Sequence, residues 1–126
     1  MPSGDHRGGS AGVLVHAGTG RVLAARAEVA AGWAAQLRGL IGRGEIASGF
    51  ALGLPGCRQV HTALLPGPLD VAFCDRDGRV LRLVQSLAPW RVSGYVAGAA
   101  IAWEAAAGAL APWLREGDAL LLLRDP

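Results

Sequence analysis

Three polar side chains, those of His61, Thr62 and Asp70, interrupt a largely apolar stretch of the chain at residues 60–73. Histidine titrates near neutral pH, so His61 has the chemistry of a general base or of a hydrogen-bond donor to a ligand. An ionised aspartate inside a protein must be paired or hydrogen-bonded, because an isolated buried charge is costly. Three alternatives for Asp70 therefore stay open. It orients His61 at a pocket, it accepts N–H groups of the turn at residues 66–68 and pins that loop, or it is simply exposed to solvent.

Trp90 and Arg91 add an aromatic ring and a cation further along the chain. The pair either forms a cation–π stack that lines a groove for a sugar or another ring, or splits into a core tryptophan and a surface arginine. Arg91 is also a candidate partner for the Asp70 carboxylate. The candidate binding residues are thus His61, Thr62, Asp70, Trp90 and Arg91.

The two cysteines, Cys57 and Cys74, complete neither a catalytic nor a metal-binding set. A nucleophilic Cys57 would need contact with His61, but four residues along a strand span about 13 Å. A zinc site made of both cysteines and His61 lacks the paired spacing of zinc motifs. We therefore expect two reduced, buried cysteines that act as small hydrophobes, with no metal and no cofactor.

The N-terminal part of the chain predicts a hairpin followed by a helix. Residues 13–15 and 21–24 flank a Gly-containing connection, which predicts a hairpin with His16 solvated at its end. A short helix is expected near residues 30–42, because apolar residues recur there at helical spacing. These residues are Trp33, Leu37, Leu40 and Ile41.

From residue 48 onward, short apolar runs separated by turn signals predict strands. The run at residues 69–75 alternates, which puts Asp70 on the face opposite to that of Val71. Residues 75–78 predict a hairpin turn, with Gly78 suited to its left-handed position. The expected strands are residues 50–54, 58–62, 69–75, 79–87, 99–104 and 119–124.

Many short strands and one early helix indicate a mainly β protein, a small antiparallel β-barrel or sandwich. The polar, Gly-rich residues 1–11 are expected to form a flexible tail, and residues 12–126 a single β-rich domain. Much of the apolar content is alanine, so the expected core relies on bulky tryptophans as fillers. These are Trp33, Trp90, Trp103 and Trp113.

Composition narrows the classes of partner. Hydrophobic residues make up 52% of the chain and charged residues 17%, which is too apolar for a disordered chain. The net charge of +2 is too small to indicate nucleic acid or an anionic membrane as partner.

The apolar stretch at residues 94–114 contains Glu104, which is expected to face solvent or to pair with an arginine. We therefore expect no membrane span. The N-terminus does not resemble a signal peptide, and the expected location is the cytoplasm.

Short motifs follow one another along the chain at residues 37–41, 62, 68–70, 73–80 and at several later positions. In their order and spacing they resemble domain-of-unknown-function family 192, a family of small bacterial and archaeal proteins. The helix signature of the family is similar to residues 37–41, with Ile41 where methionine is usual. Its central hairpin is similar to Thr62, residues 68–70 and residues 73–80. Its later landmarks are similar to Pro89, Glu104, Ala107, Gly108, Gly117 and Asp118.

The resemblance covers about residues 20–122 and implies a compact, mostly β fold without an established reaction. One departure concerns the residues before the hairpin. The usual Met-Lys-Asn-Thr is replaced here by Val60, His61 and Thr62, as in one branch of the family. That branch often has aromatic and basic residues next, whereas this chain has residues 63–66 in the order Ala, Leu, Leu, Pro.

Without an identifiable nucleophile or metal set, binding is expected over catalysis. The first hypothesis is a non-catalytic binding or accessory module whose site surrounds residues 60–70. The alternatives are a small hydrolase-like enzyme that uses His61 and Asp70, and a protein-interaction subunit that binds through an apolar or edge-strand surface. The ligand is left open between a small molecule or sugar and a protein partner, and the chain is expected to be a monomer or a weak dimer.

Overall fold

The computed structural model describes residues 11–30, 48–63 and 65–124, and the regular elements in these ranges are all β-strands. The helix expected near residues 30–42 lies outside the described residues, apart from Ala30. The expected tail also lies outside them, apart from Ala11, which begins the first strand. The strands are β1 (Ala11–His16), β2 (Val22–Val29), β3 (Phe50–Pro55), β4 (Leu69–Cys74), β5 (Val80–Leu87), β6 (Ile101–Ala106) and β7 (Leu120–Arg124).

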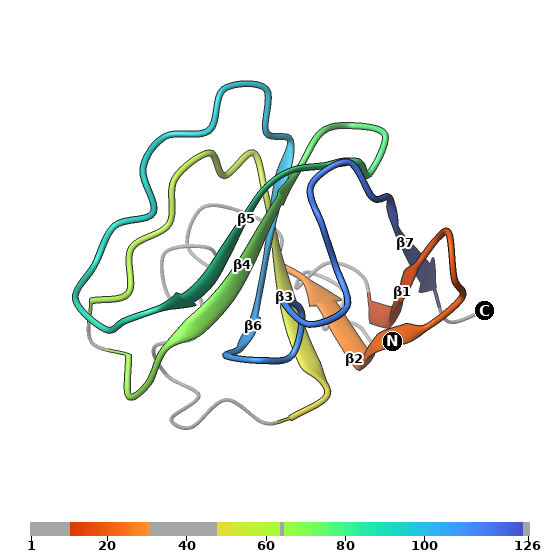
Figure 1. Ribbon diagram of the computed structural model, residues 1–126, viewed down its shortest axis with the longest axis horizontal. Helices are drawn as coiled ribbons and strands as arrows, with labels where there is room; N and C mark the ends of the chain where they lie inside the picture. The colour runs from red at the N-terminus through yellow and green to blue at the C-terminus, as the bar shows by residue number, and fades with distance from the viewer. Residues whose placement is uncertain (1–10, 31–47, 64, 125–126) are drawn as a thin grey trace, which may run out of the picture.

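These strands form one curled sheet in the order β5-β4-β6-β3-β2-β1-β7 (Figure 1). All neighbouring strands are antiparallel except β2 and β3, which run parallel. The expected mainly β fold is therefore confirmed, and the sheet is a half-barrel with one parallel pair. Turn signals did not predict this pair, because parallel neighbours are joined by a long crossover and not by a local turn.

The two edge strands, β5 and β7, approach each other at one end of the sheet and partly close the curl. Arg79 and Ala119 form an isolated antiparallel bridge just before these strands begin. The Leu120 N–H donates to the Gly78 carbonyl oxygen at 2.8 Å. Gly78 has a φ of 86°, and a Cβ there would lie 2.5 Å from the Leu120 carbonyl oxygen. Only glycine satisfies both the turn and this close approach.

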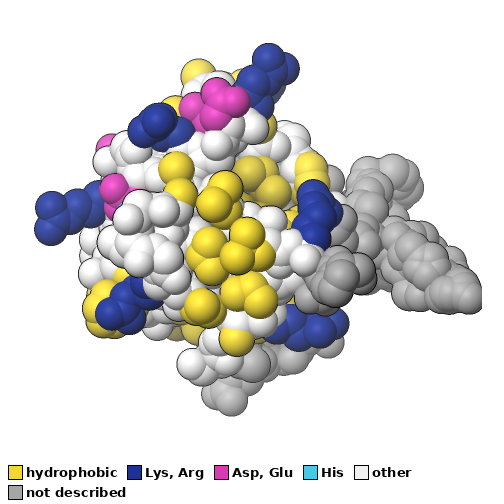
Figure 2. Space-filling view, turned by 90° about the vertical axis from the view of Figure 1, so that its right-hand side faces the viewer, with side chains coloured by type: hydrophobic (Ala, Val, Ile, Leu, Met, Phe, Trp, Pro, Cys, Tyr) yellow, Lys and Arg dark blue, Asp and Glu magenta, His cyan; other side chains and the backbone are white. Residues whose placement is uncertain are grey.

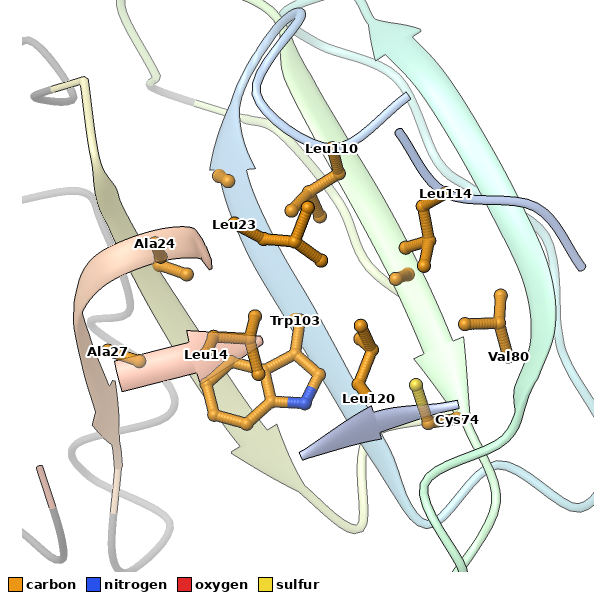
Figure 3. Close-up of a cluster of buried hydrophobic side chains, with 13 residues drawn as sticks. Leu14, Leu23, Ala24, Ala27, Cys74, Val80, Trp103, Leu110, Leu114 and Leu120 are labelled. Atoms are coloured by element: carbon orange, nitrogen blue, oxygen red, sulfur yellow. The ribbon is translucent and has the colours of Figure 1, made fainter. Parts of the chain in front are cut away.

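Apolar side chains fill the inside of the curl (Figure 3). Leu110 and Leu114 come from the loop between β6 and β7, and they point into this inner cluster with Trp103. A second cluster covers the outer face of the central strands, under Val60 and Val96 of two long connections. Both faces of β4 are consequently buried along its whole length.

The tryptophans do not all fill the core, so that expectation is wrong for two of them. Trp103 is 4% exposed, whereas Trp90 is 67% and Trp113 47% exposed. Trp33 lies outside the described residues. The inner cluster is filled instead by leucines, alanines, Cys74, Val80 and one tryptophan, Trp103.

The far end of the sheet, at β7, presents apolar side chains to the surface. Leu121 is 48% and Leu123 53% exposed, and Val22 is 54% exposed on β2. Figure 2 shows hydrophobic side chains gathered in the middle of this side of the molecule, with arginines around them. The described ranges contain no helix long and apolar enough to cross a membrane.

Candidate functional site

Asp70 is a fully buried carboxylate held by backbone N–H groups. It lies on the inner face of β4, as the alternation of that strand predicts. Its Oδ1 accepts the Ser86 N–H at 2.9 Å. Its Oδ2 accepts three N–H groups of the loop after β6, from Gly108 at 3.0 Å, Leu110 at 3.1 Å and Ala111 at 2.8 Å. The carboxylate therefore joins β5 to the loop that carries Leu110 into the core.

This arrangement corrects the expected partners of Asp70. The predicted anchoring role is right in kind, but the N–H groups come from Ser86 and residues 108–111 and not from the turn at residues 66–68. His61 is exposed, and its neighbour Val60 packs in the outer cluster. Because Asp70 faces the inner cluster, β4 itself separates the two residues. The structure therefore does not bring His61 and Asp70 together as a base and its orienting acid.

Thr62 is also fully buried, and its hydroxyl group holds the segment that contains Trp90 and Arg91. Its Oγ1 donates to the Ala88 carbonyl oxygen and accepts the Arg91 N–H at 2.9 Å. Its backbone accepts the Trp90 N–H at 3.1 Å and donates to the Arg91 carbonyl oxygen at 3.0 Å. Thr62 thus fixes the backbone on both sides of Trp90 and has its hydroxyl fully engaged.

Among the described residues, the non-glycine residues with positive φ are Ser86 at 47° and Trp90 at 63°, and Asp70 and Thr62 hold them through hydrogen bonds. Asp70 accepts the N–H of Ser86, and Thr62 accepts the N–H of Trp90 through its carbonyl oxygen. A non-glycine residue in this region is strained and persists only where its surroundings fix it. Asp70 and Thr62 therefore act as positioning residues for residues 86–91.

The positioned segment displays an exposed surface that we call the Trp90 face. Its backbone pairs with residues 58–62, through the bridge between His61 and Val92 and the Ser93 N–H that donates to the Val60 carbonyl oxygen at 2.8 Å. A hydrogen bond of 3.3 Å joins Arg58 Nη1 to the Tyr95 hydroxyl. The exposed side chains of the face are those of Arg58, His61, Trp90, Arg91, Val92 and Tyr95.

The charged side chains of the Trp90 face are arginines. Residues 48–69 and 78–103 contain no aspartate or glutamate, whereas Arg58, Arg82 and Arg91 are exposed within them. Three aspartates lie between these ranges in the chain. Asp70 is buried and engaged with backbone N–H groups, and Asp75 and Asp77 lie in the turn between β4 and β5. The face is therefore cationic as well as aromatic. No stacking of Arg91 on Trp90 occurs among the described residues, in which the cation–π pair is Arg21 with Trp113.

The cysteines offer no activated nucleophile. Both are free. Burial raises the pKa of the Cys74 thiol to about 12, and burial also raises the pKa of the partly exposed Cys57 thiol. The nucleophilic form of cysteine is the thiolate, so raised pKa values keep both groups unreactive near neutral pH. Within residues 11–30, 48–63 and 65–124, no group of His, Cys, Asp and Glu side chains is arranged to hold a metal ion.

A second histidine, His16, forms the His–Asp contact that the sequence did not predict. It is 8% exposed, so the expectation of a solvated residue is wrong. Its Nε2 lies 2.9 Å from Asp118 Oδ2, and its Nδ1 accepts the N–H groups of Gly18 at 3.1 Å and Thr19 at 3.2 Å. Because Nδ1 is an acceptor, the proton is assigned to Nε2, which donates to the carboxylate. Both ring nitrogens of His16 are hydrogen-bonded, so neither is free for general-base chemistry. The ring connects the β1–β2 turn to the loop before β7.

In the described part of the chain, Glu104 is the other buried acid, and the expectation that it faces solvent is wrong. It is 5% exposed on the outer face of β6, opposite Leu52 of β3 and Val71 of β4. Burial raises the pKa of its carboxyl group to about 7. A carboxyl group in such surroundings is favoured in its neutral form.

Comparison with known proteins supports the fold and leaves the activity open. The model of domain-of-unknown-function family 192, described as "Uncharacterized ACR", matches residues 14–122. No curated protein matches the chain.

Two solved structures are similar in fold. One is a putative transcription regulator from Sinorhizobium meliloti 1021, with 22% identity, a TM-score of 0.71, and coverage of 90% of this chain and 92% of that one. The other is a protein of unknown function from Novosphingobium aromaticivorans DSM 12444, with 19% identity, a TM-score of 0.68, and coverage of 96% and 99%. At these identities the likeness shows the fold alone.

Proposed function

Because the chain belongs to domain-of-unknown-function family 192, an uncharacterised family, we propose a function from its own residues. The protein is a non-catalytic accessory module that binds an acidic partner protein through the Trp90 face. His61, Trp90 and Arg91 contact the partner, and the buried Thr62 and Asp70 hold the segment in place.

The exposure of Trp90 on a strained backbone carries this proposal. An indole buries a large apolar area when it enters a core, so folding alone favours a buried tryptophan. Here the indole is 67% exposed at a residue with a φ of 63°. A buried threonine holds that conformation. Strain that is maintained by dedicated contacts and that displays an aromatic group to solvent is typical of a binding site.

The composition of the face indicates the kind of partner. Tryptophan, tyrosine and arginine are enriched in protein interfaces, whereas lysine and acidic residues are depleted. Trp90, Tyr95 and Arg91 follow this pattern, and no exposed acid occurs in residues 78–103. A cationic aromatic surface is complementary to a partner segment that carries carboxylates beside apolar side chains.

A catalytic role has less support from the same residues. The Asp70 carboxylate is saturated by four backbone N–H groups and lies across β4 from His61. Neither cysteine has the lowered pKa of a nucleophile. The alternative of a hydrolase that uses His61 and Asp70 therefore lacks its central contact.

The experiment uses matched tryptophan variants in a quantitative capture of partners. The parent chain, the double variant Trp90→Asn with Arg91→Gln, and the control Trp113→Asn are immobilised, and proteins from cells of the source organism are captured and quantified by mass spectrometry. Asparagine tolerates positive φ, so the double variant keeps the backbone while it removes the ring and the charge. The control removes another exposed tryptophan, far along the chain from the face.

The proposal predicts one or more acidic partners that the parent and the Trp113 control retain equally and that the double variant loses. Retention should also weaken as salt rises, because the attraction between exposed charges is screened. An identical captured set for all three proteins would overturn the proposal. Loss of the partners only in the Trp113 control would overturn it as well, since the contact would then lie elsewhere.

A further inference from the structure

A groove of about 760 Å³ lies between the β1–β2 turn and the loop that precedes β7. Thr19 and Arg21 contribute to it from the turn, and Trp113, Arg115 and Asp118 contribute from the loop. Its volume falls in the range of small-molecule sites. It is separate from the Trp90 face, because none of its lining residues belongs to residues 58–62 or 86–95.

Arg21 and Trp113 give this groove an oriented cation beside an aromatic surface. The Arg21 guanidinium carbon lies over the Trp113 ring, 3.7 Å from its centroid, which is a cation–π contact. A guanidinium that stacks on a ring keeps its in-plane N–H groups available to a ligand. Those N–H groups form the fork that matches a carboxylate or a phosphate.

The walls of the groove are fixed before any ligand arrives. His16 accepts N–H groups of Gly18 and Thr19 and donates to Asp118, so its ring joins the turn to the loop. Asp118 Oδ2 also accepts the Arg115 N–H at 2.9 Å, which fixes the start of the last turn. A preorganised site binds more tightly because less ordering is needed on association.

The charges of the groove favour an anion. Two arginines, Arg21 and Arg115, and one aspartate, Asp118, line the groove, and the Asp118 carboxylate already accepts N–H groups from His16 and Arg115. Hydrogen bonds from the Arg115 N–H and from His16 lower the pKa of Asp118. Its negative charge is therefore already hydrogen-bonded to these two residues. The lining therefore keeps a net positive charge beside an apolar surface made by Pro112 and Trp113.

We propose that this groove binds a small organic anion, a phosphate or carboxylate head on a flat ring. The Arg21 guanidinium pairs with the head, Arg115 adds a second positive charge, and the ring packs on Trp113 and Pro112. The site is independent of the Trp90 face, so its failure would leave the proposed partner binding untouched.

Titration of the full chain followed by NMR tests the inference with two probes, inorganic phosphate and phenyl phosphate. The signal observed is the indole N–H of Trp113, assigned by comparison with Trp113→Leu. Phenyl phosphate should bind about fivefold more tightly than inorganic phosphate, because it adds a ring contact. Arg21→Gln should weaken phenyl phosphate about tenfold, as expected for loss of a charge-assisted contact.

Two further variants make the result specific to the groove. Trp113→Leu should remove the preference for phenyl phosphate while inorganic phosphate still binds, as followed by the backbone N–H signals of residues 18 and 19. Arg82→Gln, which removes an exposed arginine from β5, should change neither affinity. The inference is wrong if millimolar phenyl phosphate leaves the Trp113 signal unmoved. It is also wrong if Arg82→Gln weakens binding as much as Arg21→Gln, because the attraction would then be a general effect of charge.

Discussion

Asp70 accepts the N–H of Ser86 at 2.9 Å, at the point where β5 has one residue more than β4. Leu69 pairs with Leu87 and Val71 with Val84, so two residues of β5, Gln85 and Ser86, lie opposite Asp70 alone. A bulge leaves an N–H group without its ladder partner. The Asp70 carboxylate accepts that N–H group and also those of three residues in the loop after β6. The buried acid of the stretch at residues 60–73 is therefore an anchor for a bulge and a loop.

Thr62→Val tests whether the hydroxyl group of Thr62 holds the Trp90 segment. Valine keeps the shape of the side chain but loses both hydrogen bonds, so the partly buried Ala88 carbonyl oxygen and Arg91 N–H lose this partner. We expect a loss of about 1–3 kcal/mol in the free energy of unfolding and faster hydrogen exchange at the Arg91 N–H. Thr19→Val is the matched control, because the Thr19 hydroxyl accepts one exposed N–H at 3.2 Å. Equal losses in both variants would contradict the role of Thr62.

Trp90→Asn is expected to keep or raise the free energy of unfolding, in spite of the loss of a large side chain. The indole is 67% exposed and contributes little to the core, while asparagine adopts a φ of 63° with less strain. Urea unfolding of the variant and the parent measures the effect. A loss of more than about 1.5 kcal/mol would show that the ring packs as a core residue does.

Glu104→Gln tests the buried acid through the pH dependence of stability. The pKa of Glu104 is raised from 4.5 to about 7 in the folded state, so the folded state holds this proton more tightly than the unfolded state. The contribution of protonated Glu104 to the free energy of unfolding is complete below pH 4.5 and is lost as pH rises through 7. A pKa difference of this size corresponds to about 3 kcal/mol.

The parent should therefore lose stability between pH 4.5 and 7, and Glu104→Gln should be less sensitive to pH and more stable than the parent at pH 8. Urea unfolding at a series of pH values measures this. Glu116→Gln, at an exposed position, is the control and should follow the parent. Parallel pH profiles for the parent and Glu104→Gln would refute the assignment.

Gly53→Ala tests how closely β3 and β6 pack inside the curl. A Cβ at residue 53 would lie 2.8 Å and 2.9 Å from two ring atoms of Trp103 and 3.0 Å from Ile101 Cδ1. The indole is 4% exposed and has no room to move away, so we expect overpacking to reduce stability by about 1–3 kcal/mol. Thermal unfolding measures the change. Gly67→Ala is the control, because a Cβ there has no neighbour within 4 Å.

Much of the fold is local in origin and could be predicted. The hairpin of β4 and β5 could be predicted because its turn, which contains Gly78, directly follows one strand and precedes the other. The alternation in β4 correctly predicted that Asp70 lies on the face opposite to that of Val71. The parallel pairing of β2 with β3 could not be predicted, because no local signal marks a strand that returns after a long connection.

The candidate site depends on contacts that are distant in the chain. Asp70 meets residues up to 41 positions away, and His16 meets Asp118 across 102 positions. Nothing near His16 in the sequence distinguishes a buried, hydrogen-bonded histidine from a solvated one at a hairpin end. The exposure of Trp113 could not be predicted from the sequence either, because its neighbours Leu110 and Leu114 have the apolar spacing of a buried segment. The contacts of Asp70 and His16 and the exposure of Trp113 all depend on how the loop between β6 and β7 packs against the rest of the chain.

A decisive experiment compares the free energy of unfolding of Asp70→Asn with that of His61→Ala. We expect a loss of about 2–4 kcal/mol for Asp70→Asn, because the NH2 group of asparagine would replace a carboxylate oxygen that accepts backbone N–H groups in the interior. We expect a change within about 0.5 kcal/mol for His61→Ala, since that side chain is exposed. Similar losses in both variants would show that the two residues act as a structural unit, and would contradict the division between a buried anchor and a displayed face.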